Sequence, residues 1–130
     1  MRPSTFAARL SSSIAEFAPV ATSLGEWLAK AFPEAVVVSV AAPHPSDFGQ
    51  GRQWFSVRGV TEENRPQRVA PVLPVFEKTV RALQAQFGAT PASTVLVGFS
   101  QGGIMALESA RAGQELAARV VSLAGRFAQL

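Results

Sequence analysis

Three short apolar runs rich in β-branched residues punctuate this chain of 130 residues. They are AVVVSVA at 35–41, STVLVGF at 93–99 and RVVSLAG at 119–125. Runs of this length and composition are typical of strands buried on both faces, as in parallel sheets. Helical patterns lie between them, and parallel strands joined through helices require right-handed crossovers. The sequence therefore predicts an α/β fold of three layers, with helices on both faces of a parallel sheet of about three recognisable strands.

The first predicted helix precedes the run at 35–41. Ser23 and Glu26 have the spacing of a capping box, and Pro33 ends the pattern. The segment between them, LGEWLAKAF, places four apolar side chains on one helical face: Leu24, Trp27, Leu28 and Ala31.

A longer helix is predicted between the first two runs. Its apolar positions recur at steps of three and four: Val69, Val72, Leu73, Phe76, Val80, Leu83 and Phe87. Since proline favours the first turn, the regular helix is expected to begin near Pro71 or Pro74. Gly88 and Pro91 end it, and a further helix is expected from Gln101 to about Ala112.

The composition bounds the class of protein. Hydrophobic residues make up 48% and charged residues 16%, as in a globular chain. Cysteine is absent and histidine occurs once, so disulfides, thiolate nucleophiles and cysteine or histidine metal sites are not expected. The lack of cysteine fits a cytoplasmic protein. Residues 1–22 show no clear period and are interpreted as a poorly defined leader, with the domain at 23–130.

Two further classes of partner are disfavoured. No stretch approaches the roughly 20 apolar residues of a membrane span. The net charge is +3, but the arginines are scattered and do not interleave with aromatic residues, so nucleic-acid binding is not expected. No phosphate-binding or dinucleotide-binding motif occurs, so no cofactor is predicted.

The most specific motif is Gly98-Phe99-Ser100-Gln101-Gly102. A predicted strand ends just before Ser100 and a predicted helix starts just after it, which is the setting of a nucleophile elbow. Such a turn needs small residues two positions before and after the serine. The N–H of Gln101 at the helix start could meet a developing oxyanion. The alternative is an ordinary strand-to-helix turn with a capping serine.

GFSQGG together with GRQWFSVRGVTEENR resembles the phospholipase/carboxylesterase family of α/β-hydrolases, which includes acyl-protein thioesterases. The likeness is greatest to its bacterial small-esterase branch and runs from about Trp27 to Phe127. It implies a partial α/β-hydrolase fold and a serine hydrolase of small-molecule acyl esters or thioesters. Ser100 would be the nucleophile that forms an acyl intermediate, and the Gln101 N–H one oxyanion donor. Trp54 and Phe55 would line an acyl pocket, unless these aromatics pin their loop to the core.

The residues that would activate Ser100 are missing from the expected places. In this fold the acid and then the histidine follow the serine, but only Glu108 and Glu115 follow Ser100, in positions typical of solvated residues. His44 precedes Ser100, and the lone aspartate, Asp47, has no evident place beside it.

The start of the chain also departs from the family. The family's first strand, with its His-Gly turn and second oxyanion donor, has no counterpart in the first thirty residues. These gaps indicate a chain truncated at both ends relative to the family, with weak or no turnover. The alternative is a non-catalytic interaction module or gene fragment of the same fold. A homo-oligomer through exposed sheet edges would suit such a product.

Overall fold

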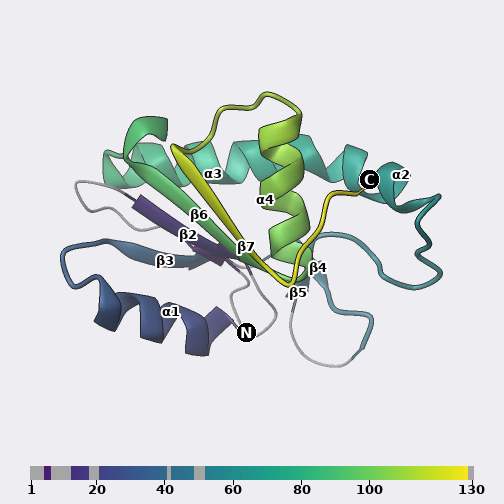
Figure 1. Ribbon diagram of the computed structural model, residues 1–130, viewed down its shortest axis with the longest axis horizontal. Coiled ribbons are helices and arrows are strands. Elements are labelled where there is room, and N and C mark those ends of the chain that lie inside the picture. Colours follow the sequence, from purple (N-terminus) through teal and green to yellow (C-terminus); the bar gives the residue numbers. More distant parts are fainter. Residues whose placement is uncertain (1–4, 7–12, 18–20, 41, 49–51, 129–130) are drawn as a thin grey trace.

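A five-stranded sheet forms the middle of the molecule (Figure 1). The computed structural model describes residues 5–6, 13–17, 21–40, 42–48 and 52–128. The strand order is β1-β3-β2-β6-β7, and all neighbours are parallel except β1, which is antiparallel to β3. The strands are β1 (Thr5–Phe6), β2 (Ser13–Phe17), β3 (Val37–Val40), β6 (Thr94–Phe99) and β7 (Arg119–Leu123).

The three strands predicted from the sequence are β3, β6 and β7, and the structure confirms them. It adds β1 and β2, which come from the segment interpreted as a leader. β2 lies at the centre of the sheet, with Ser13 opposite Thr94 and Phe17 opposite Gly98. Its sequence, SIAEF, contains a serine, an alanine and a glutamate, so its composition gives little indication of a central strand. Pairing with strands on both sides, which are distant in sequence, decides its conformation.

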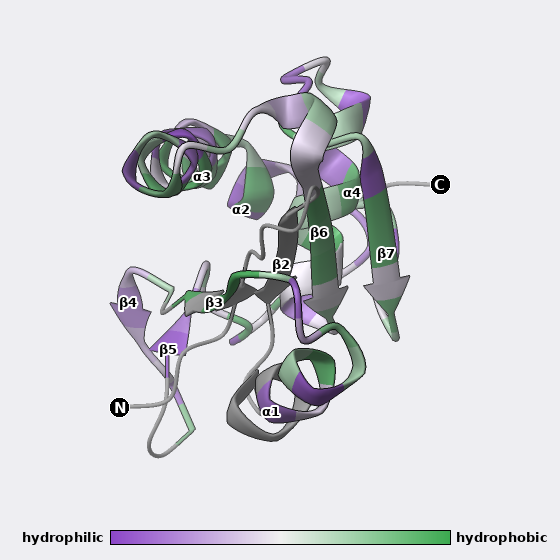
Figure 2. Cartoon of the chain, turned by 90° about the vertical axis from the view of Figure 1, so that its left-hand side faces the viewer, coloured by the Kyte–Doolittle hydropathy of each residue, from purple (hydrophilic) through white to green (hydrophobic). Residues whose placement is uncertain are grey.

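Helices cover both faces of the sheet, as Figures 1 and 2 show. On one face lies α1 (Ala21–Ala31), and on the other lie α3 (Leu73–Phe87) and α4 (Gln101–Arg111). The short helices α2 (Arg65–Val69) and η1 (Ala70–Val72) lead into α3, and η2 (Pro91–Ser93) follows it. β4 (His44–Pro45) and β5 (Arg52–Gln53) form a separate antiparallel pair. The predicted three-layer α/β arrangement is confirmed.

The apolar stripe of the long helix lies where the sequence predicts except at its last member, Phe87, which is exposed. Val69, Val72, Phe76 and Val80 are buried. The regular helix begins at Leu73, so Pro74 occupies its first turn. The helix ends at Gly88, whose φ of 64° is the left-handed conformation of a helix C-terminus.

The first helix differs from its prediction. It begins at Ala21, so Ser23 lies within the helix and the predicted capping box is wrong. The predicted apolar face is wrong for Trp27, whose residue surface is 62% exposed, and for Ala31, which is also exposed. Leu28 is buried, and the Leu24 side chain lies outside the described residues. Leu28 packs with Val97 in a small cluster on this face of the sheet. The helix therefore contacts the sheet along a narrower strip than its sequence pattern indicates.

Strand β6 separates two apolar clusters. Leu96 belongs to the main cluster under α3 and α4, while Val97 faces the α1 side. Burial on both faces explains the continuous apolar run of this strand. Among the described residues, no helix is long and apolar enough to cross a bilayer.

Candidate active site

Ser100 occupies the turn between β6 and α4 in a conformation that few side chains adopt. Its φ is 55° and its ψ is −115°, outside the main allowed regions for an L-residue. Conformations of this kind cost about 1–3 kcal/mol and persist only where the surroundings impose them. The predicted strand–turn–helix context is therefore present, with a strained backbone at the serine itself.

Two glycines make this turn possible. A Cβ at Gly98 would lie 2.5 Å from the carbonyl carbon of Gly102 and from the nitrogen of Gly103. A Cβ on Gly103 would meet the hydroxyl of Ser122 and lie 3.1 Å from the Cα of Gly125. The start of α4 thus packs against both β6 and the end of β7 at distances that exclude a side chain.

Backbone hydrogen bonds hold the serine on two sides. The N–H of Ser100 donates to the carbonyl oxygen of Leu123 in β7 at 2.7 Å. The carbonyl oxygen of Ser100 accepts from the N–H of Ile104 at 3.0 Å. Gln101 is the first residue of α4, where helix geometry leaves the N–H without an intrahelical acceptor. That N–H is suited to bind an anionic oxygen beside Ser100.

A second region approaches the elbow from the carboxyl end of β3. We call residues 42–48 and 52–58 the front loop. The side chain of Gln101 joins it to the elbow: Oε1 accepts from the N–H of Trp54 at 2.6 Å, and Nε2 donates to the carbonyl oxygen of Phe55 at 2.8 Å. The loop is therefore attached to the residue that follows the candidate nucleophile.

The front loop is also anchored by its aromatic side chains. Trp54 is 1% exposed and Phe55 is 5% exposed, and both belong to the main core cluster. The indole of Trp54 meets the ring of Phe76 edge-on, with the centroids 5.1 Å apart. Side chains this buried have little surface to offer a ligand. Their placement favours the alternative in which they pin the loop to the core over the assignment to an acyl pocket.

Asp47 organises the polar part of the front loop. Its Oδ2 accepts from the hydroxyl of Ser56 at 2.6 Å and from the N–H of Val57 at 3.2 Å. These contacts, led by the Ser56 hydrogen bond and joined by the nearby guanidinium of Arg58, lower the pKa of Asp47 below its ordinary value of 3.8. Asp47 therefore holds the front loop together through hydrogen bonds to Ser56 and Val57.

The other candidate bases and acids come from segments outside the elbow turn. His44 is exposed in β4, opposite Gln53. Glu115 is exposed in the connection after α4. Within the described ranges, no hydrogen bond joins the Ser100 hydroxyl to any of these groups, and no cluster of metal-ligating side chains occurs.

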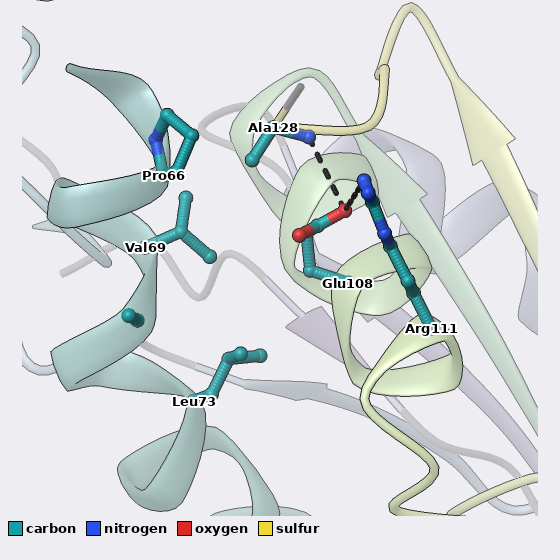
Figure 3. Close-up of a pocket in the computed structure, with 7 residues that line it drawn as sticks. Pro66, Val69, Leu73, Glu108, Arg111 and Ala128 are labelled. Carbon is teal, nitrogen blue, oxygen red and sulfur yellow. Dashed lines mark hydrogen bonds and ion pairs between the residues drawn. The ribbon is translucent and has the colours of Figure 1, made fainter. Parts of the chain in front are cut away.

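Glu108 departs from the expectation of a solvated residue. Its side chain is 12% exposed, and its Oε2 accepts from the N–H of Ala128 at 3.2 Å and pairs with Arg111 at 3.6 Å (Figure 3). It borders a cavity of about 270 Å³ between α2 and α4, lined by Pro66, Val69, Ala70, Leu73, Glu108, Arg111 and Ala128. Glu108 therefore secures the segment after β7 to the far part of α4.

Residues 20–130 match the protein family described as phospholipase/carboxylesterase. The chain belongs to this family. Esterase YpfH of Escherichia coli (strain K12) is 51% identical to it over 113 residues, which are 86% of this chain and 49% of that protein. The crystal structure of esterase PE8 superposes with a TM-score of 0.59 at 34% identity, covering 67% of this chain and 42% of the other. The chain thus spans about half the length of the curated relative it matches.

Membership of the phospholipase/carboxylesterase family agrees with the resemblance found in the sequence motifs, and it supports a partial α/β-hydrolase fold. One contact of the site was not predicted, the bond pair between the Gln101 side chain and the front loop. The only available signal was the motif itself, in which a long polar amide follows the serine.

Proposed function

We propose that this chain carries the nucleophile of a carboxylic ester hydrolase of the phospholipase/carboxylesterase family. The observation that carries the proposal is the backbone of Ser100, with φ 55° and ψ −115° between β6 and α4. An ordinary capping serine needs no such strain. A nucleophile elbow does, because the turn lifts the serine hydroxyl out of the backbone toward substrate.

The reaction would proceed through an acyl-Ser100 intermediate. The Oγ of Ser100 attacks the carbonyl carbon of an ester or thioester, its proton passes to a base, and the negative oxygen faces the N–H of Gln101. Collapse expels the alcohol or thiol, which takes up a proton, and water then releases the acid. The substrate class is small-molecule acyl esters or thioesters, and no cofactor enters the reaction.

The isolated chain is expected to turn over weakly or not at all. The described residues provide Ser100 with no hydrogen-bonded base, and a serine hydroxyl is a poor nucleophile without one. Enzymes stripped of their acid and base retain only about 10³–10⁴-fold acceleration over water from the oxyanion hole and binding.

The test uses hydrolysis of p-nitrophenyl butyrate. The chain itself, and a chimera in which it replaces the matching half of the Escherichia coli relative, are each compared with their Ser100→Ala variants. The proposal expects Ser100-dependent hydrolysis by the chimera and little by the chain. A folded chimera without Ser100-dependent hydrolysis, beside an active parent esterase, would refute it. Robust Ser100-dependent turnover by the chain alone would overturn the expectation of weakness and direct attention to His44.

A second candidate is a non-catalytic interaction module. Among the described strands β7 pairs only with β6, and it exposes 42% of Val121 and 40% of Leu123. An edge strand with exposed apolar side chains can pair with a second copy of the chain. Light scattering after size-exclusion chromatography would show a dimer that Val121→Lys dissociates. A monomer at all concentrations tested would remove this candidate.

A further inference from the structure

The amide side chain of Gln101 makes a matched pair of hydrogen bonds across the molecule. Its Oε1 accepts a hydrogen bond from the N–H of Trp54 at 2.6 Å, and its Nε2 donates to the carbonyl oxygen of Phe55 at 2.8 Å. The partners are 47 and 46 positions away in sequence, so the pair links the first turn of α4 to the front loop. Only a group with one donor and one acceptor in this order fits both partners.

The two loop groups need these partners. Trp54 and Phe55 are almost fully buried, and backbone N–H and C=O groups in such surroundings are nearly always hydrogen-bonded. The bonds therefore act in both directions: the loop gains partners for its peptide groups, and the side chain of Gln101 is held in one position. A fixed side chain restrains the Cα of Gln101 and, with it, the peptide group that joins Ser100 to Gln101. The N–H of Gln101 belongs to that peptide group.

We infer that the Gln101 side chain is a positioning group, which docks the front loop on the elbow and thereby fixes the direction of the Gln101 backbone N–H beside Ser100. The catalytic meaning of that N–H rests on the proposed function. The positioning itself does not, and it is measurable without substrate.

Two substitutions separate the hydrogen bonds from the size of the side chain. Gln101→Met keeps the length but can make neither bond. Gln101→Glu is nearly isosteric, and its effect depends on protonation. A neutral carboxyl can accept from the Trp54 N–H and donate to the Phe55 carbonyl, whereas an ionised one presents a second acceptor to that carbonyl. Hydrogen bonding of the neutral form raises the pKa of the introduced carboxyl above the ordinary value of about 4.3.

The experiment measures two properties by NMR, from about pH 4.5 to about pH 8, on the full chain. One is the exchange rate of the Trp54 amide hydrogen, corrected for its intrinsic pH dependence. The other is the residual dipolar coupling of the backbone N–H at position 101, which reports its direction. In Gln101→Met, exchange is expected to be about 10-fold faster and the coupling changed at every pH. In Gln101→Glu, both properties should match wild type at low pH and move toward the Met values as pH rises.

Controls exclude the other sources of a change. Asp47 and His44 are the titratable groups of the described front loop, alongside Arg52 and Arg58. Arg68 of α2 donates to the carbonyl oxygen of Ser56 in the same loop, and all of these groups are present in every variant. A pH dependence of the Trp54 exchange or of the coupling at position 101 therefore supports the inference only if it occurs in Gln101→Glu and not in the other variants. Gln84→Met is the matched control, because Gln84 is also buried and bonded twice, to Thr94 and Leu116, away from the loop. It should leave both readouts at their wild-type values.

The outcomes separate the two proposals. Equal Trp54 exchange in wild type, Gln101→Met and Gln101→Glu would overturn the inference, and so would changed exchange with an unchanged coupling at position 101. Neither result depends on ester hydrolysis. Conversely, a chimera without Ser100-dependent hydrolysis would remove the proposed function while the positioning readouts stand.

Discussion

The elbow around Ser100 and the front loop meet at Gln101, yet they are held in place by different means. The elbow is held by its backbone: Ser100 has a strained conformation, glycines permit close contact between chain segments, and the N–H of Ser100 donates to the carbonyl oxygen of Leu123. The front loop has almost no regular structure and depends on side chains, such as Asp47 and Trp54. The elbow is therefore encoded mainly by residues near Ser100 in sequence, with support from the end of β7, whereas the front loop is fixed to the rest of the molecule by contacts with distant residues, Phe76 and Gln101.

The largest effect is expected from closing the space behind the elbow. In Gly98→Ala the new Cβ would lie 2.5 Å from backbone atoms of Gly102 and Gly103, which cannot move without shifting α4. We expect the free energy of unfolding in urea to fall by more than about 4 kcal/mol, or folding to fail. Gly88→Ala is the control. It has a positive φ but nothing within 4 Å of a Cβ, so about 1 kcal/mol is expected. Similar losses in both variants would contradict the steric account.

The next effect tests the anchor of the front loop. Trp54→Ala removes a side chain that is 1% exposed and stacked edge-on against Phe76. Such a truncation lowers the free energy of unfolding by about 3–4 kcal/mol. Phe48→Ala, in the same loop but 69% exposed, should cost less than about 1 kcal/mol. If the two variants are equally stable, Trp54 does not anchor the loop.

A gain in stability is expected where the elbow is strained. Ser100→Gly removes the Cβ from a backbone with φ 55° and ψ −115°, and should raise the free energy of unfolding by about 1 kcal/mol. Ser100→Ala also loses the hydroxyl but keeps the Cβ, so its stability should stay near wild type. Thermal unfolding followed by calorimetry measures both. A Gly variant less stable than the Ala variant would show that the backbone at Ser100 is relaxed.

The same division explains how far the sequence predicts the structure. The motif Gly98–Gly102 predicts the elbow because most of the residues that shape the turn lie within a few positions of Ser100, although its contacts with Leu123 and Gly125 come from the end of β7 and beyond. The stripe of α3 and the strands β6 and β7 are also local patterns. β2 is not, because SIAEF becomes a central strand only through pairing with β3 and β6. The contacts of Gln101 with the front loop likewise join segments 46 and 47 positions apart, which composition does not reveal.

The smallest effect concerns the polar contacts of the front loop at acid pH. The Ser56 hydroxyl, with Gln53, the Val57 N–H and Arg58, holds the pKa of Asp47 below 3.8 in the folded chain. A group whose folded pKa is lowered adds stability above its unfolded pKa, and this contribution is lost as pH falls through the lower folded value. The midpoint of the pH-dependent shift of the Val57 amide resonance should therefore lie below pH 3.8.

Asp47→Asn is the control for this titration, because it keeps an oxygen that can accept from Ser56 and Val57 but cannot ionise. Its Val57 resonance should show no step in the same range. A titration midpoint at or above pH 3.8 in wild type would mean that the folded loop does not favour the carboxylate. The front loop would then depend on its buried aromatics alone, and the contrast with the elbow would be one of apolar packing against backbone geometry.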